Sequence, residues 1–69
     1  MEYLRKLRLF KHGDYEIWGY LCRPEDMYFV LVEDNDDEPI DVTDEYQTQA
    51  EAWNHAKQLA QEFGEAVAG

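Results

Sequence analysis

The sequence predicts an α+β fold: an antiparallel sheet of three to four strands with one C-terminal helix packed on one face. Two runs of aromatic and branched residues, 15–23 and 27–33, are separated by the short turn sequence "RPED". Further along the chain, a helix-capping pattern is followed by apolar residues at helical spacing. A chain of 69 residues has room for one small core, so residues 1–69 are expected to form a single domain.

The N-terminal segment, residues 3–11, fits two structures. Its sequence "LRL" alternates as a strand does, while Tyr3, Leu7 and Phe10 fall on one side of a helix. The turn sequence "KHGD" that follows leads directly into the next strand, which favours a strand antiparallel to it.

The two central runs form a predicted hairpin whose faces are both apolar or aromatic. A single helix covers only one of these faces. A patch such as Trp18, Tyr20, Tyr28 and Val30, or its counterpart on the opposite side, is therefore expected near solvent as a contact surface. After an acidic loop, "IDV" at 40–42 is expected to add a short edge strand.

The C-terminal third predicts a helix from about residue 49 to 63. "TQAE" has the capping-box spacing, in which the Thr48 side chain accepts a hydrogen bond from the amide of Glu51. Gly64 is the expected terminator, with continuation of "EAVAG" as a frayed turn as the alternative. Two large aromatic residues of this helix, Trp53 and Phe63, are expected to hold the fold together. They belong to an apolar stripe that comprises Ala52, Trp53, Ala56, Leu59, Ala60, Phe63 and Val67.

Charge is distributed unevenly along the chain. Residues 1–11 carry +3 and residues 12–69 carry -13, which add to the net -10. Such a protein repels nucleic acid and anionic membranes and attracts basic surfaces. The N-terminal cations Arg5, Lys6 and Arg8 are expected to pair with acids on a neighbouring strand or in the acidic loop. The predicted charged footprint for a partner comprises Glu33, Asp34, Asp36, Asp37, Glu38, Asp41, Asp44 and Glu45, with Trp18, Tyr20 and Tyr28 as aromatic anchors.

The acidic run has part of the ligand spacing of a calcium-binding loop. Asp34, Asp36, Glu38 and Glu45 occupy the first, third, fifth and twelfth positions of such a loop. The sixth position needs glycine for a sharp turn, and here it is Pro39. The two histidines do not have the spacing of a zinc site. We therefore expect neither a metal site nor a bound cofactor.

Catalytic motifs are absent from the sequence as well. Cys22 lies within a predicted strand, where a buried structural thiol is the expected role. It is the only cysteine, so an internal disulfide is excluded and the cytoplasm is the default compartment. No apolar run approaches the length needed to span a membrane. These observations predict a soluble protein that is not an enzyme.

The whole chain, with "YQTQAEAWNHAKQLAQEFGE" as its helix, resembles in size, charge and layout the small proteins of phages and mobile elements, among them anti-CRISPR proteins and other DNA mimics. The resemblance implies a basic nucleic-acid-binding protein as target, such as a CRISPR effector complex in the host cytoplasm. The leading hypothesis is therefore a non-enzymatic acidic inhibitor, present as a monomer or weak homodimer. The alternative is a structural or adaptor module that self-associates or docks through its uncovered aromatic face.

Overall fold

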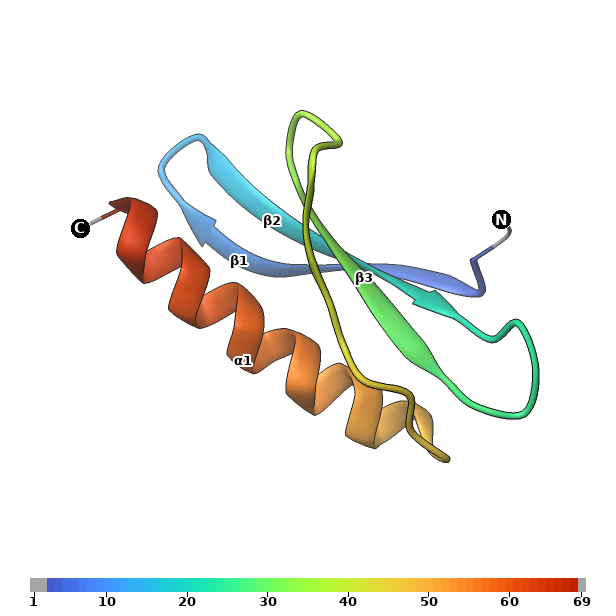
Figure 1. Cartoon of the computed structure of the whole chain (residues 1–69). Coiled ribbons are helices and arrows are strands. Elements are labelled where there is room, and N and C mark those ends of the chain that lie inside the picture. The colour runs from blue at the N-terminus through green and yellow to red at the C-terminus, as the bar shows by residue number, and fades with distance from the viewer. Residues whose placement is uncertain (1–2, 69) are drawn as a thin grey trace.

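The computed structural model describes residues 3–68, which form one four-stranded antiparallel sheet and one helix (Figure 1). The predicted α+β fold class is confirmed. Each strand lies beside its neighbour in the chain, in the order β1-β2-β3-β4. The first segment forms a strand, as favoured above, and "IDV" lies in the edge strand. The elements are β1 Arg5–His12, β2 Tyr15–Cys22, β3 Phe29–Asp34, β4 Pro39–Val42 and α1 Gln49–Ala68.

Strand β1 contains a bulge at Leu9. Arg8 pairs with Trp18 and Phe10 pairs with Ile17, so Leu9 is an extra residue opposite a continuous β2. Leu9 and Phe10 both pack against the core on the helix side, although they are consecutive. The bulge thus lets β1 contribute two neighbouring apolar side chains to the same face.

The core lies between the sheet and α1. Ile17 and Leu21 of β2 and Val30 and Val32 of β3 are fully or almost fully buried there. Trp53 packs its indole directly on the backbone of Gly19, where a Cβ atom would lie 2.9 Å from Trp53 Cζ3. The glycine in "IWGY" therefore makes room for the largest side chain of the core.

The helix differs from its predicted extent because Gly64 does not end it. Helix α1 continues to Ala68, and Gly64 is buried where its backbone meets the ring of Phe10. Phe63, expected in the core, is 39% exposed, and Val67 is 56% exposed. The buried stripe instead has small residues at intervals of four, which lets the helix lie close to the sheet: Ala52, Ala56, Ala60 and Gly64.

The expected aromatic patch was wrong for strand β3. Tyr20 pairs with Leu31 and Leu21 pairs with Val30, so Val30 shares the buried face of Leu21. Tyr28 precedes the strand, packs against the core and forms an isolated bridge to Tyr46. A one-residue difference in register exchanges the two faces of a strand. The six-residue connection 23–28 pairs Cys22 with Phe29, and this register places Phe29 and Leu31 on the face of Trp18 in place of Tyr28 and Val30.

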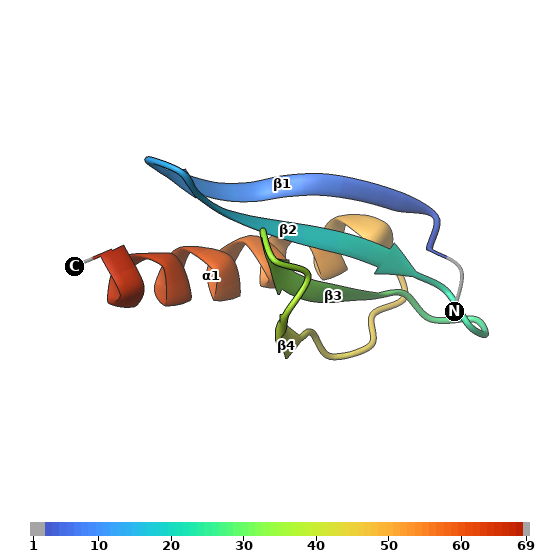
Figure 2. The ribbon, with the colours of Figure 1, turned by 90° about the horizontal axis from the view of Figure 1, so that it is seen from above.

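The molecule is elongated, with principal extents of 37 × 19 × 14 Å. Helix α1 lies along one side of the sheet, and the described chain places no other element on the opposite side (Figures 1 and 2). The β1–β2 and β3–β4 turns lie at one end of the strands. The β2–β3 loop and the connection from β4 to α1 lie at the other end, about 26 Å away for an eight-residue strand.

Candidate acidic interface

The β3–β4 turn is held in one conformation by the side chain of Asp34. Its Oδ1 accepts hydrogen bonds from the amides of Asp36 at 2.9 Å and Glu38 at 3.0 Å. Asp37 has a φ of 61°, in the left-handed region that Asp and Asn tolerate better than most residues. Asp34 therefore shapes the turn, while Asp36, Asp37 and Glu38 are exposed.

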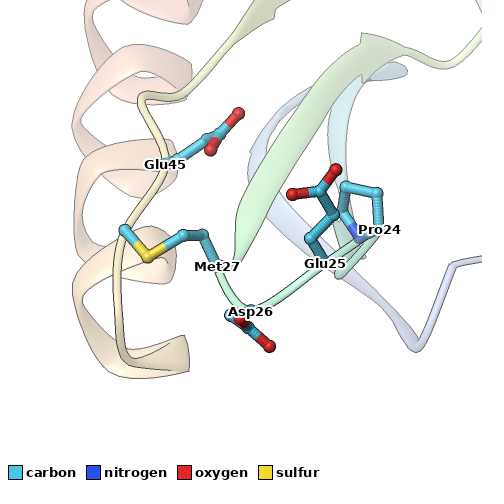
Figure 3. A pocket seen from close by; sticks show the side chains of 5 residues that line it. All are labelled: Pro24, Glu25, Asp26, Met27 and Glu45. Atoms are coloured by element: carbon cyan, nitrogen blue, oxygen red, sulfur yellow. The ribbon is translucent and has the colours of Figure 1, made fainter.

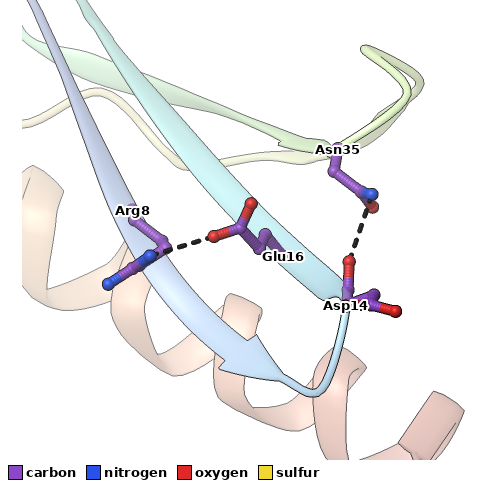
Figure 4. Close-up of polar contacts among 4 residues, drawn as sticks. All are labelled: Arg8, Asp14, Glu16 and Asn35. Atoms are coloured by element: carbon purple, nitrogen blue, oxygen red, sulfur yellow. Dashed lines mark hydrogen bonds and ion pairs between the residues drawn. The ribbon is translucent and has the colours of Figure 1, made fainter.

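The two turns at this end of the sheet are joined. Asn35 Nδ2 donates to the carbonyl oxygen of Asp14 at 3.3 Å, which ties the β3–β4 turn to the β1–β2 turn (Figure 4). Asp14 therefore comes close to the acids of the β3–β4 turn. It was not predicted as a site residue, because only the pairing of the strands brings the two turns together. One end of the molecule thus presents Asp14, Asp36, Asp37 and Glu38.

A second acidic group lies at the opposite end. A hollow of about 420 Å³ is lined by Pro24, Glu25, Asp26, Met27 and Glu45 (Figure 3). Exposed Asp44 lies next to Glu45 in the connection from β4 to α1. Glu25 and Asp26 were also missed from the sequence, where "RPED" was interpreted only as a turn. The sequence did indicate a second acidic group, because the predicted hairpin places the "RPED" turn at the end of the sheet opposite "EDNDDE".

The remaining predicted acids belong to neither end group. Glu33 is half-buried in β3 opposite Trp18. Asp41 is exposed in β4, and its carboxylate accepts a hydrogen bond from the amide of Val42 at 2.8 Å. The eight predicted acids therefore divide into two end groups and three residues with local contacts, counting Asp34 among the latter.

The cations neutralise little of this charge. Arg8 Nη1 donates to Glu16 Oε2 at 2.9 Å, the one ion pair within residues 3–68 (Figure 4). Lys6 Nζ lies instead over the rings of Trp18 at 4.7 Å and Tyr20 at 5.2 Å. The expected pairing of N-terminal cations with acids is right for Arg8 and wrong for Arg5 and Lys6, which form no ion pair within residues 3–68. The acids at both ends of the sheet therefore have no cationic partner within residues 3–68.

The sheet face turned away from α1 is called the outer face below. The strand register places Trp18 and Tyr20 on it, beside Leu31 and Phe29 of β3. Val42 of β4 pairs with Leu31 and is 51% exposed. Trp18 and Tyr20 thus lie on the face that α1 does not cover, as predicted, but with different neighbours. Both are half-buried, because Lys6 lies over their rings and the Tyr3 ring meets that of Tyr20 edge-on at 4.9 Å. Tyr28 does not, since it packs on the core side under the guanidinium of Arg23, 4.9 Å from its ring centre.

The groups able to perform nucleophilic or metal chemistry are poorly placed for it. Cys22 is buried, and burial raises the pKa of its thiol, so the reactive thiolate is disfavoured. His55 Nδ1 is hydrogen-bonded to the Tyr46 hydroxyl at 2.9 Å. Within residues 3–68, no group of three or more His, Cys, Asp or Glu side chains is arranged to hold a metal ion. Glu45 lies at the opposite end of the sheet from Asp34, so the calcium-loop spacing does not form a loop.

Helix α1 lacks the run of apolar residues that a membrane-spanning helix requires, and the described chain has no other helix. Comparisons with models of protein families, with curated proteins and with solved structures give no match for this chain. What the chain does must therefore be inferred from its own surface.

Proposed function

We propose that this protein is a non-enzymatic inhibitor that occupies the nucleic-acid site of a basic protein or complex. The observation that carries the proposal is the exposure of acidic side chains at both ends of a single sheet. At one end they are Asp36, Asp37 and Glu38, and at the other Asp44 and Glu45. Acids carried on the turns of a folded sheet bind a rigid partner with less loss of conformational entropy than a flexible acidic tail does.

The dimensions and charge support DNA mimicry. DNA carries about one negative charge per 1.7 Å of axis, so a 37 Å segment has roughly 22. The protein carries 16 acids and a net charge of -10 over the same length. It therefore offers almost half the net charge of a DNA segment about one helical turn long. A groove that binds phosphates would attract it from a distance, and salt would weaken that attraction.

The site chemistry supports a role in binding. The hollow between Met27 and Glu45 is lined by three carboxylates and no nucleophile, and Cys22 is buried. The resemblance to anti-CRISPR proteins of phages makes a CRISPR effector complex in the host cytoplasm one instance of the proposed target. Competition with DNA, without direct binding to DNA, is the behaviour that this function requires.

The test begins with capture of bacterial proteins on the immobilised chain at low salt, stepwise elution with salt, and identification of what elutes. Each eluted nucleic-acid-binding protein is then assayed for binding to duplex DNA in the presence of the parent chain. Inhibition that weakens as salt rises is expected. An eluate without nucleic-acid-binding proteins, or one whose DNA binding the parent chain leaves unchanged, would count against the proposal.

Two variants of equal charge locate the surface. The triple variant D36N/D37N/E38Q removes three charges from the β3–β4 turn and leaves Asp34 to hold the turn. The control E51Q/E62Q/E65Q removes three charges from the exposed side of α1, so both variants carry a net charge of -7. The turn variant is expected to lose more inhibition than the helix variant. Equal inhibition by both variants and the parent would refute the acidic footprint.

A further inference from the structure

The outer face differs in charge from the rest of the molecule. The strand register places Lys6, Arg8 and Lys11 of β1 on it, together with Glu16 and Glu33. Three cations and two acids give +1, which leaves -11 for the remainder of a chain whose net charge is -10. This apolar, nearly neutral face is therefore the surface on which a second strongly acidic molecule meets the least repulsion.

We propose that the outer face is covered by a second copy of this chain, related to the first by a two-fold axis parallel to the strands. Such an axis reverses the order of the strands across the interface. Strand β1 of each copy then lies over β4 of the other, and β2 lies over β3. The association uses the outer face and reaches the acidic ends only at Glu38, so it does not rest on the proposed inhibitory function.

The charges select this axis over the perpendicular one. The cations of the outer face lie along β1, whereas Glu33 and the exposed Glu38 lie toward the β3–β4 side. An axis parallel to the strands keeps both turns of each copy at the same end. Lys11, next to the β1–β2 turn, then approaches Glu38 of the second copy. An axis perpendicular to the strands would place β1 over β1, with cations facing cations.

The apolar side chains fit the same arrangement. Trp18 and Tyr20 of β2 would pack against β3 of the second copy, where Leu31 and Phe29 lie on the outer face. Val42 would pack near the Lys6 stem, since both lie at the level of the Tyr20–Leu31 pair. Two twisted sheets that pack face to face in this way hold their strands within about 30° of each other.

The size of the face predicts a reversible dimer. Strands about 26 Å long, with about 14 Å between the outermost strands of a four-stranded sheet, give a flat area near 370 Å². This lies below the roughly 800 Å² per partner of a typical stable interface. The fraction of dimer should therefore rise with protein concentration and fall on dilution.

A single-stranded nucleic acid is the other occupant that an aromatic sheet face with cations suggests. Two observations disfavour it. Lys6 already lies over the rings of Trp18 and Tyr20, on which bases would have to stack. The net charge of -10 also opposes the approach of a phosphate backbone. The experiment below includes an oligonucleotide so that this outcome is seen if it occurs.

Sedimentation equilibrium over a range of concentrations measures the association, with two valine substitutions as a matched pair. The parent should shift from 8.2 kDa toward twice that mass as concentration rises. Val42→Glu places a charge on the outer face, and Val67→Glu places the same charge on α1 at similar exposure, 51% against 56%. Loss of dimer in the first variant alone supports the proposal. A parent that stays monomeric, or equal dimerisation by both variants, overturns it.

Charge reversal tests the axis at two exposed positions where a loss of folding is not expected. Lys11→Glu and Glu38→Lys should each weaken the dimer by about three- to tenfold, and the double variant should recover the parent affinity. A dimer that Lys11→Glu strengthens would contradict the axis, because that result requires β1 over β1.

A fluorescent thymidine oligonucleotide should show no binding at low salt. Binding that Val42→Glu abolishes would assign the face to nucleic acid and overturn the dimer.

Discussion

The substitution Gly64→Ala tests how α1 is held against the sheet. In most helix interiors, alanine in place of glycine stabilises the folded state by about 0.5–1 kcal/mol, because the unfolded glycine has more conformational freedom to lose. Here the added methyl group would point into the ring of Phe10, closer than non-bonded carbon atoms approach. The structure therefore predicts a change of opposite sign.

The expected size follows from the two opposing effects. Forcing an extra methyl group into a packed contact costs about 1–3 kcal/mol. Subtracting the gain in helix propensity leaves Gly64→Ala destabilised by about 1 kcal/mol at the midpoints of the two ranges, and by about 2.5 kcal/mol at most. In a domain of this size each kcal/mol lowers the melting temperature by about 4–8 °C. Such a change is well outside the error of a melting experiment.

Urea unfolding followed by far-UV circular dichroism measures the effect, and Phe10→Ala provides the control background. Without the ring, the new methyl group meets no obstacle, so Gly64→Ala should stabilise Phe10→Ala by about 0.5–1 kcal/mol. The sign of the substitution should thus depend on residue 10. If Gly64→Ala stabilises the parent chain itself, the ring of Phe10 does not hold the helix at this point and the reasoning fails.

Three further predictions concern the core. Trp53→Ala should cost roughly 3–5 kcal/mol, because the indole is only 8% exposed, and Phe63→Ala should cost much less in the same urea titration. Thr43→Val should cost about 1–3 kcal/mol, since the buried Thr43 Oγ1 accepts from the amide of Val30 at 2.9 Å and valine would leave that donor unpaired. Burial raises the pKa of Cys22, so near neutral pH its reaction with a disulfide reagent should be slow in the folded chain and fast in urea, as read by absorbance.

Local patterns were sufficient to predict most of the fold. The Thr48 hydroxyl accepts a hydrogen bond from the Glu51 amide at 3.3 Å, as the capping-box spacing predicts. The alternation of apolar residues placed Ile17 and Leu21 on one face of β2, and both are buried. These features depend on residues close together in the chain, which is why a single sequence reveals them.

Features that depend on distant residues were not predictable in the same way. The burial of Gly64 depends on Phe10, more than fifty positions earlier, and a terminating glycine and a packing glycine look identical in the sequence. Which side chains of β3 share a face with Trp18 depends on the register across the β2–β3 loop. The acidic footprint was found only in part for the same reason, since Asp14 and Glu25 join it through the topology of the sheet.

The bulge at Leu9 has a consequence for how the chain behaves at high concentration. An unpaired edge strand is a template on which further strands add, and such growth has no natural end. In β1 the bulge interrupts the regular spacing of hydrogen-bonding groups and cationic residues lie along the strand. The opposite edge, β4, is only four residues long and begins with Pro39, which has no amide proton to donate. Both edges therefore resist extension into fibrils, so the sheet can leave an apolar face uncovered without becoming prone to open-ended aggregation.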